Sequence, residues 1–371
     1  TVDNREEKVD EKASIFAYSI GNLYEVLKKE LEKNEMLDLF NNIEMPVLEV
    51  LADMQYRGMY VDKEELIKYG DELKAKLEEL TKTIHELAGE EFNINSPKQL
   101  GEILFEKLKL PVVKKTKSGY STDVDTLEKL QNEHEIIEYI LDYRQLAKLN
   151  STYVEGLIPY INKNTDRIHS YFHQTVTATG RISSTEPNLQ NIPTRIEIGK
   201  KLRKVFKPAE SKIFLDADYS QIELRILAHV SKDEIMIDNF NNDEDIHAQA
   251  ASRVFGIPIE EVTKELRSKA KAVNFGIVYG ISDFGLAEQI HSSRKEAKQY
   301  IEQYLDKYHG IREFMTSVVE EAKAKGFIAT MYNRRRYIPE LKSKNFMVRK
   351  FGDRVAMNTP IQGSATDIMK I

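Results

Sequence analysis

The 371-residue sequence has no cysteine, no tryptophan and only 10 prolines. The lack of cysteine excludes a disulfide scaffold, a zinc site with thiolate ligands and a cysteine nucleophile. No apolar run approaches the roughly 18 residues that a membrane-spanning helix requires, and the first residues do not resemble a signal peptide. We therefore expect a cytoplasmic protein that has no membrane partner.

A net positive charge is also lacking, because 60 acidic residues outnumber 54 basic ones. The charge is unevenly distributed along the chain. Residues 1–100 contain 13 basic and 23 acidic side chains, whereas residues 251–350 contain 19 basic and 12 acidic ones. The acidic part favours a solvated helical surface. A basic zone inside an acidic chain is typical of a surface that binds nucleic acid.

The hydrophobic pattern is mainly helical. Apolar residues recur three or four positions apart over most of the chain, which predicts amphipathic helices. Ser96 followed by Pro97 indicates a helix start, with serine as the N-cap and proline in the first turn. Residues 110–122 contain three lysines and predict an exposed basic loop. Helices are predicted over 18–40, 47–56, 63–87, 125–150, 221–230 and 244–325, and from 344 onwards.

Strands are expected in two places. The alternation of polar and apolar residues over 167–177 predicts one strand. Residues 213–218 predict a second, short and buried strand that ends in Asp216 and Asp218. A turn is predicted over 331–339, where three consecutive arginines favour a phosphate contact over a solvated run. Strands that carry acids, flanked by helical segments, indicate an α+β fold.

The first candidate site lies in residues 216–225, which begin with the two aspartates of the predicted strand end. A carboxylate at the end of a strand can hold a hard cation together with backbone oxygens and substrate phosphates. Mg²⁺ uses one or two protein carboxylates and leaves its other positions to water and phosphate. Taken alone, an Asp-X-Asp sequence is more often a turn or a cap than a metal site.

The second candidate site is a row of side chains on one predicted helix. Arg267, Lys271, Phe275 and Tyr279 are each four residues apart, so they drift only ~40° per step along one face. Two cations near the N-terminal end would hold a polyphosphate, and the aromatic rings would stack on a base. Gly280 is the predicted C-cap. The alternative is an ordinary amphipathic helix with two solvated cations and two core aromatics.

The third candidate site is the polar loop 177–193, which contains Arg181, Asn188 and Gln190. Guanidinium and amide groups suit contacts with phosphates and with acceptors in the minor groove. Without the other two sites, this segment would be read simply as a loop.

Together these segments resemble family A DNA polymerases. Residues 218–225 are similar to motif A of that family, and residues 267–280 are similar to motif B. Residues 177–193 match the loop before motif A, and residues 358–365 match the segment that leads back into the palm. The resemblance covers essentially the whole chain in the family's order. It implies an α+β right-hand polymerase fold with a helix-rich thumb, helix-rich fingers and an antiparallel palm sheet.

The resemblance also implies a domain order. Residues 1–45 would be the C-terminal tail of a 3′–5′ exonuclease-like domain, and residues 46–150 would be the thumb. Residues 151–243 would be the first part of the palm, residues 244–344 the fingers, and residues 345–371 the continuation of the palm.

Residue roles follow from the same resemblance. Two Mg²⁺ ions would be bound by Asp218 and the Tyr219 carbonyl. Glu223 would bond to Tyr279 and exclude a ribose 2′-hydroxyl. The implied catalytic residues are Asp218, Arg267 and Lys271, with Lys271 as the proton donor to departing pyrophosphate. The implied nucleotide-binding residues are Gln221, Glu223, His247, Arg267, Lys271, Phe275 and Tyr279. The implied DNA-binding residues are Ser96, Lys98, Lys148, Arg181, Asn188, Gln190, Asn358 and Gln362.

The activity implied by the resemblance is template-directed DNA synthesis in replication or repair, in the bacterial nucleoid. Primer–template DNA and dNTPs would be the partners. Family members continue to a His-Asp-Glu motif that carries a second metal carboxylate. No histidine in these 371 residues is directly followed by an aspartate, so this motif is absent from them. We therefore expect activity to need that segment from elsewhere, for example from a second polypeptide.

Two other hypotheses remain open. One is a catalytically inactive fragment that binds primer–template and dNTP. The other is a carboxylate-dependent nuclease that uses Asp216, Asp218 and residues 243–245, although such an enzyme would not need a helix that holds a triphosphate. The family usually has a small or apolar residue at the position of Asp216, for which we favour a structural role.

Overall fold

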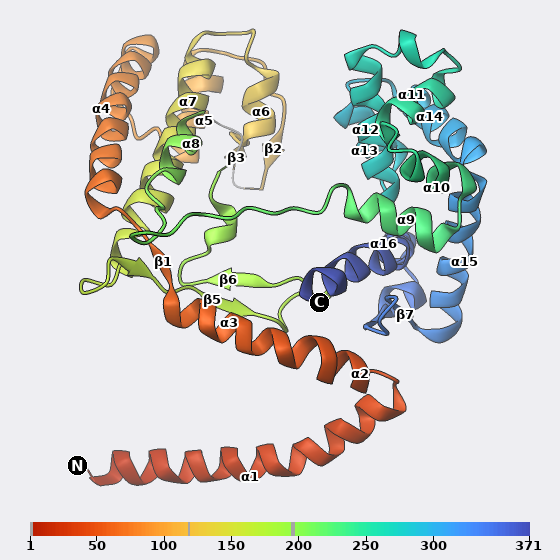
Figure 1. The fold of residues 1–371 in the computed structure, drawn as a ribbon. Helices are drawn as coiled ribbons and strands as arrows, with labels where there is room; N and C mark the ends of the chain where they lie inside the picture. Colours follow the sequence, from red (N-terminus) through yellow and green to blue (C-terminus); the bar gives the residue numbers. More distant parts are fainter. Residues whose placement is uncertain (1–2, 118, 194–196) are drawn as a thin grey trace. The chain divides into compact units, whose positions relative to one another are not determined.

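The computed structural model describes residues 3–117, 119–193 and 197–371. Its contacts divide the chain into two compact units. Unit 1 comprises Thr1–Leu51, His173–Ile182 and Asp216–Ile371, and unit 2 comprises Ala52–Phe172 and Ser183–Leu215. Figure 1 shows the helices and strands of both units and labels most of them. The thumb, palm and fingers boundaries are a different division, and they stay a prediction.

Unit 2 is built on two packed helices, α4 (Lys63–Ala88) and α7 (Ile136–Lys148). The Asp62 side chain caps α4 by accepting a hydrogen bond from the Glu65 amide, and Gly89 ends the helix with a φ of 71°. This confirms the long helix predicted over 63–87. Two apolar clusters, one around Leu66 and one around Ile137, form the core of the unit.

The prediction of one continuous helix over 125–150 is wrong. The structure has α6 (Val124–Lys129), a turn, and then α7, which continues into the π-helix η3 (Leu149–Glu155). Asp123 starts α6 as its N-cap, because its side chain accepts a hydrogen bond from the Thr126 amide. The polar run after Leu130 interrupts the apolar pattern, so the chain turns before α7.

The smaller elements of unit 2 include the predicted Ser96 cap. The Ser96 hydroxyl accepts a hydrogen bond from the Gln99 amide at 3.4 Å. The predicted basic loop is exposed over most of its described residues and contains the hairpin of β2 (Lys115–Thr116) and β3 (Gly119–Tyr120). The short helices are α5 (Pro97–Gly101), η2 (Glu102–Lys107), η4 (Ile158–Tyr160), η5 (Leu189–Asn191) and α8 (Glu197–Arg203). The strands are β1 (Met59–Tyr60), β2 (Lys115–Thr116), β3 (Gly119–Tyr120), β4 (Arg167–Ile168), β5 (Tyr171–His173) and β6 (Ser183–Thr185).

These strands form two-stranded sheets, of which the β1–β4 and β2–β3 pairs are antiparallel. Met59 lies opposite Ile168 in the β1–β4 pair, and β5 pairs with β6. The single strand predicted over 167–177 is therefore two short strands with different partners.

Unit 1 begins with a long helix and ends with another. The N-terminal elements are α1 (Asp3–Lys33), α2 (Leu37–Leu39), η1 (Phe40–Glu44) and α3 (Met45–Arg57), which ends in unit 2 at Gly58. The later helices are α9 (Ile222–Ser231), α10 (Glu234–Asn241), α11 (Ile246–Phe255), η6 (Ile259–Glu261), α12 (Lys264–Val278), α13 (Asp283–Gln289), α14 (Arg294–Lys307), α15 (His309–Lys325), η7 (Pro339–Lys342) and α16 (Phe346–Lys370). The helices predicted over 221–230 and 244–325 and from 344 are confirmed.

A hairpin stands where a turn was predicted over 331–339. Strand β7 (Phe327–Ala329) pairs with β8 (Arg335–Tyr337), and Ile328 lies opposite Arg336. The turn itself is confined to the residues between these strands. The predicted arginine run is therefore partly strand.

The strand predicted over 213–218 is wrong. This segment is extended but unpaired, and Ile213, Phe214 and Leu215 are 87, 55 and 91% exposed. A strand is stable when its N–H and C=O groups pair with a neighbour, and none of the described strands pairs with this segment. Asp216 and Asp218 therefore lie on an extended, unpaired segment and not at the end of a strand.

In the described part of the chain, no helix combines the length and the apolar character needed to cross a membrane.

Candidate functional site

The second candidate site lies on α12, in unit 1. The Thr263 hydroxyl caps this helix by accepting a hydrogen bond from the Leu266 amide at 3.2 Å. At its C-terminal end Tyr279 is the C-cap and Gly280 follows with a φ of 64°. The Gly280 amide donates to the Ile277 carbonyl at 3.0 Å, and the next amide donates to Gly276 at 2.7 Å. This double closure fixes the backbone at Tyr279.

The basic end of α12 is tied to the start of α11. Arg267 Nε donates to Asp245 Oδ2 at 2.7 Å, and Asp245 Oδ1 accepts from the amides of His247 and Ala248. Burial would raise the pKa of Asp245, but the Arg267 hydrogen bond and charge and the helix amides hold it below its usual value. Lys271 is exposed one turn further on, and its Nζ lies 6.0 Å from the centre of the Phe275 ring.

His247 lies behind this basic face. Its ring is buried, with 3% exposed, and its Nδ1 is 2.9 Å from the Asn274 amide nitrogen. Burial, together with the charge of Arg267, lowers the pKa of His247 to about 4. The imidazole is therefore neutral near pH 7 and can offer a hydrogen bond but no positive charge. Its ring centre lies 5.8 Å from that of Phe275.

Glu223 joins three segments of the site. The Tyr279 hydroxyl donates to Glu223 Oε2 at 2.7 Å, and Arg181 donates to Glu223 Oε1 at 3.0 Å. The loop before β6, the start of α9 and the end of α12 thus meet on one carboxylate. Burial and the neighbouring Glu223 raise the pKa of Tyr279 to about 12, so its hydroxyl stays protonated and keeps donating. The expected Glu223–Tyr279 contact is present, whereas the Arg181 contact was not anticipated.

Helix α16 carries two further predicted residues to the same region. Asn358 Nδ2 donates to the Val278 carbonyl at 3.1 Å, which connects α16 to the last turn of α12. Gln362 lies one turn further along α16 and is half-buried. Gln221 is the N-cap of α9, with a φ of 53°.

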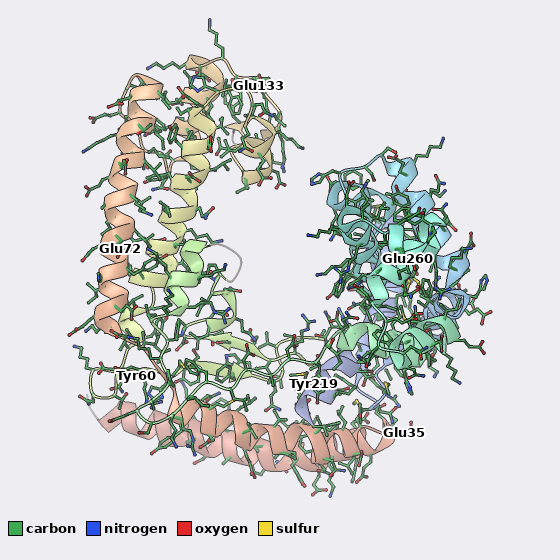
Figure 2. The ribbon with its side chains drawn as sticks, turned by 45° about the horizontal axis from the view of Figure 1, so that its top comes forward. Glu35, Tyr60, Glu72, Glu133, Tyr219 and Glu260 are labelled. Carbon is green, nitrogen blue, oxygen red and sulfur yellow. The ribbon has the colours of Figure 1, made fainter. Side chains whose placement is uncertain are left out.

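The carboxylate end of the site is much less organised. Asp216, Asp218 and Tyr219 are exposed, and Figure 2 labels Tyr219 in its place before α9. Nowhere in residues 3–117, 119–193 and 197–371 do three or more His, Cys, Asp or Glu side chains form a group that could hold a metal ion. The Asp218 carboxylate and the Tyr219 carbonyl are hard oxygen donors of the kind that Mg²⁺ takes, but they supply only one carboxylate.

The carboxylates proposed for a nuclease do not come together. Asp245 is engaged by Arg267 and by the first amides of α11, where it is both a cap and an ion-pair partner. With Asp245 used in this way, the described residues offer no cluster that joins it to Asp216 and Asp218.

The remaining predicted DNA contacts lie in unit 2. Ser96 caps α5, and the Asn188 side chain accepts from the Gln190 amide at 3.0 Å, so both have local structural roles. Lys98 is exposed and lies 4.0 Å from Glu102, and Lys148 is the exposed last residue of α7.

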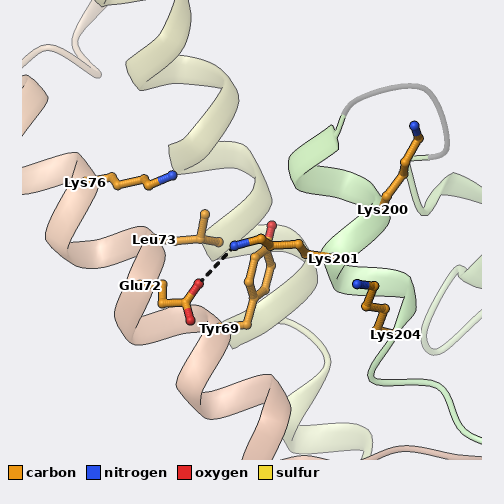
Figure 3. Close-up of a pocket in the computed structure, with 7 residues that line it drawn as sticks. All are labelled: Tyr69, Glu72, Leu73, Lys76, Lys200, Lys201 and Lys204. Carbon is orange, nitrogen blue, oxygen red and sulfur yellow. Dashed lines mark hydrogen bonds and ion pairs between the residues drawn. The ribbon is translucent and has the colours of Figure 1, made fainter.

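A basic pocket in unit 2 was not predicted (Figure 3). It has a volume of about 350 Å³ and lies between α4 and α8. One lysine, Lys201, lies 3.5 Å from Glu72. The surplus of lysines favours an anionic ligand. Its signal was the run Gly-Lys-Lys-Leu-Arg-Lys at 199–204, which the sequence interpretation passed over. The residues that line it are Tyr69, Glu72, Leu73, Lys76, Lys200, Lys201 and Lys204.

Comparison with known proteins gives consistent matches. Residues 63–371 match the model of DNA polymerase family A. The chain is 55% identical over 355 residues to DNA polymerase I of Bacillus subtilis (strain 168), covering 95% of this chain and 40% of that protein. It is 52% identical, with the same coverage, to DNA polymerase I of Geobacillus stearothermophilus.

A solved structure supports the same conclusion about the fold. It is described as the POL domain of Pol1 from M. smegmatis in complex with DNA primer-template and dNTP. The match has a TM-score of 0.86 and 43% identity, and it covers 94% of this chain and 62% of that one. The predicted α+β right-hand polymerase fold is thereby confirmed.

The fold is that of a polymerase domain of the right-hand class. More specifically, this chain belongs to DNA polymerase family A. It spans about 40% of the length of the curated relatives that it matches.

Proposed function

We propose that this chain carries the nucleotide-binding and primer-positioning part of a DNA-directed DNA polymerase. The reaction is transfer of a nucleotide from a dNTP to the 3′-hydroxyl of a primer, directed by a template. The observation that carries the proposal is the α12 face, on which Arg267 and Lys271 precede Phe275 and Tyr279, in a chain of family A. Residues 1–45, 46–150, 151–243, 244–344 and 345–371 would be the exonuclease-like tail, thumb, palm, fingers and continued palm.

The α12 face would hold the incoming nucleotide. Arg267 and Lys271 would bind its phosphates, and Lys271 would protonate the departing pyrophosphate. His247, which is neutral, would add a hydrogen bond rather than a charge. Phe275 would pack on the sugar and base. Phosphoryl transfer depends mainly on positioning and on charge stabilisation, which are the two things that this face offers.

The sugar would be selected by Glu223. Its carboxylate is held by Tyr279 and Arg181, so it forms a fixed wall rather than a mobile side chain. A ribose 2′-hydroxyl would meet this wall, while a deoxyribose would leave it undisturbed. Gln221, the N-cap of the same helix, completes the predicted nucleotide-binding set.

The DNA would be contacted from both units. In unit 1, Arg181 and Gln362 would contact minor-groove acceptors at the primer end, with Asn358 close to them. Such acceptors are shared by all base pairs, so the contact checks the shape of the pair and ignores its sequence. In unit 2, the proposed contacts with template, primer or phosphate backbone are Ser96, Lys98, Lys148, Asn188 and Gln190.

Two Mg²⁺ ions would act at the carboxylate end, bound by Asp218 and the Tyr219 carbonyl. They would polarise the phosphate and favour attack by the primer hydroxyl. Because this end offers one carboxylate, a further segment with a second carboxylate is needed, from a longer form of the protein or from a second polypeptide. The alternative is a fragment that binds primer–template and dNTP without turnover. We place either activity in the bacterial nucleoid.

Primer extension tests the proposal. The protein in its natural length and residues 1–371 alone are each assayed with primer–template, dNTPs and Mg²⁺, and intact mass identifies every polypeptide present. Extension by the natural-length protein, lost on Lys271→Ala, supports the proposed enzyme. Binding of DNA and dNTP without extension in both samples supports the inactive alternative, and absence of both overturns the proposal.

A further inference from the structure

A cluster of buried charges in unit 1 has no role in the proposed function. It contains two acids and two bases, which are Glu44, Arg334, Asp367 and Lys370. Arg334 Nε donates to Asp367 Oδ1 at 2.7 Å, Lys370 Nζ donates to Glu44 Oε1 at 2.7 Å, and Arg334 also donates to Glu44. The Asp367 side chain is fully buried, and only 3% of that of Lys370 is exposed. The expectation that this arginine contacts phosphate is wrong, because its guanidinium is already engaged.

Two members of the cluster, Glu44 and Arg334, have pKa values shifted in the direction that favours their charged forms. Burial would raise the pKa of Glu44, but hydrogen bonds from Lys370 and Arg334 hold it below its usual value. Burial would likewise lower the pKa of Arg334, but the charges of Asp367 and Glu44 keep it raised. The two acids and two bases of the cluster balance in charge. Removing one member would leave another charge buried without a partner, so each member is expected to hold the others in place.

Arg334 supports the loop that carries Arg181. A Cβ atom added to Gly180 would lie 2.6 Å from Arg334 Nε, so the backbone of Gly180 rests directly on the guanidinium. Gly180 has a φ of 81°, which favours glycine. The loop is also closed on itself, since the Thr177 hydroxyl donates to the Arg181 carbonyl at 2.5 Å.

The same hairpin supports the turn of α16 that carries Gln362. The Thr330 hydroxyl donates to Asp367 Oδ2 at 2.6 Å, and its methyl group fills the space at Gly363, where a Cβ would lie 2.5 Å away. The Met331 amide donates to the Ser364 hydroxyl at 3.0 Å. Arg181 and Gln362, the two proposed contacts of the primer end, therefore have a common support.

We propose that Arg334 is a positioning residue for recognition of the primer end. Held between Asp367 and Glu44, it supports Gly180 so that Arg181 and Gln362 meet the minor groove of the terminal base pair together. Lysine would not replace it, because a point charge lacks the planar fork that bonds two carboxylates and supports the glycine. This inference rests on the proposed function, since it needs Arg181 to contact the primer.

A double-mutant cycle tests the inference in the natural-length protein. Arg334→Lys, Arg181→Ala and the double variant are compared in extension of primers with matched and mismatched ends. Arg334→Lys should slow matched extension about tenfold, leave the KM for dNTP unchanged and weaken the preference for matched ends. In the Arg181→Ala background the same change should cost less than about twofold. Binding of matched and mismatched primer–template, followed by fluorescence anisotropy, gives the same comparison without turnover.

Two further variants separate positioning from folding. Arg335→Lys is the matched control, because its side chain bonds Asn34 and packs on Phe327 instead of Gly180, and it should behave as the parent protein. Gly180→Ala disturbs the support from the loop side and should reproduce the effect of Arg334→Lys while the ion pairs remain. The inference is overturned if the losses of extension rate in Arg334→Lys and Arg181→Ala simply multiply in the double variant. It is also overturned if Gly180→Ala extends primers as the parent protein does. If Arg181→Ala alone is silent, the proposed primer contact fails instead.

Discussion

The two ends of the candidate site are held very differently. At the α12 end, Arg267 is fixed by Asp245, and Tyr279 is fixed by Glu223. At the other end, Asp218 is exposed on an extended segment, and no described side chain bonds to it. The first end is organised without a ligand, whereas in the proposed function the second end would acquire its geometry from metal ions, phosphates and further residues. Nucleotide binding and chemistry should therefore be separable by mutation.

The largest effect is expected at the unorganised end. Asp218→Asn removes the proposed metal carboxylate and should lower the single-turnover rate of nucleotide incorporation by on the order of 10³-fold. Affinity for dNTP should change little, because the nucleotide-binding residues proposed on α12 are unchanged. Asp216→Asn is the matched control, being equally exposed and two residues away, and it should cost no more than a few-fold. An equal loss in both variants would contradict the assignment of the metal to Asp218.

A smaller loss is expected at the organised end. Lys271→Ala should remove about 2–4 kcal/mol of transition-state stabilisation, and affinity for dNTP should fall with it because this end is also proposed to bind the phosphates. Rates and nucleotide affinities are measured together by quench-flow. Lys269→Ala is the control on the same helix, since Lys269 is paired with Glu265 at 2.7 Å. If Lys271→Ala left dNTP binding unchanged, the separation of the two ends would fail.

The neutral His247 predicts a pH dependence of stability. Its pKa is lowered to about 4 in the folded protein, while an unfolded chain has the ordinary value near 6.5. The unfolded state therefore takes up the proton first as pH falls. The contribution of His247 is complete above about pH 6.5 and is lost between pH 6.5 and 4, by about 1–3 kcal/mol in all.

Urea unfolding at pH 7.5 and at pH 5 measures this effect. His247→Gln should make the difference in the free energy of unfolding between the two pH values smaller. His229→Gln, a change at an exposed histidine of α9, should leave that difference as it is. If His247→Gln left the difference in the free energy of unfolding between the two pH values unchanged, the imidazole would not be buried in the neutral form.

The smallest effect concerns sugar selection. Tyr279→Phe removes one hydrogen bond to Glu223, worth about 1 kcal/mol, and should reduce the preference for dNTP over rNTP about fivefold. Competition between labelled dNTP and rNTP in primer extension measures it. Tyr337→Phe, at an exposed position of β8, is the control. An unchanged preference would mean that Arg181 alone holds the Glu223 wall.

The helical part of the site could be predicted because its signals are local. The spacing of Arg267, Lys271, Phe275 and Tyr279 predicted a helix, which is confirmed, and Gly280 marked its end. The function of the face that these residues share stays a prediction. Such patterns depend on residues three or four positions apart, which a sequence displays directly. The roles of the site residues, in contrast, came only from the family resemblance, and they stay predictions.

The errors arose where contacts are distant in sequence. Residues 213–218 have the composition of a buried strand, but no local signal says whether a partner strand lies beside them. The sequence around Arg334 is typical of a surface arginine. Its burial depends on its partner Glu44, which lies 290 residues earlier in the chain. A period or a motif carries no information about such pairs, so burial of this charge could not be foreseen.

The distance between Glu44 and its cations also bears on how the chain folds during translation. Glu44 is made 326 residues before Lys370, which at roughly 5–20 residues per second is a delay of about 16–65 s. The segment Ala52–Phe172, which holds most of unit 2, is synthesised in that interval and can assemble while the ribosome is still working. The pairing of the Glu44 carboxylate in unit 1 is complete only when Arg334 and then Lys370 of α16 have been made. The interior of unit 1 is therefore expected to close after most of unit 2 has been synthesised.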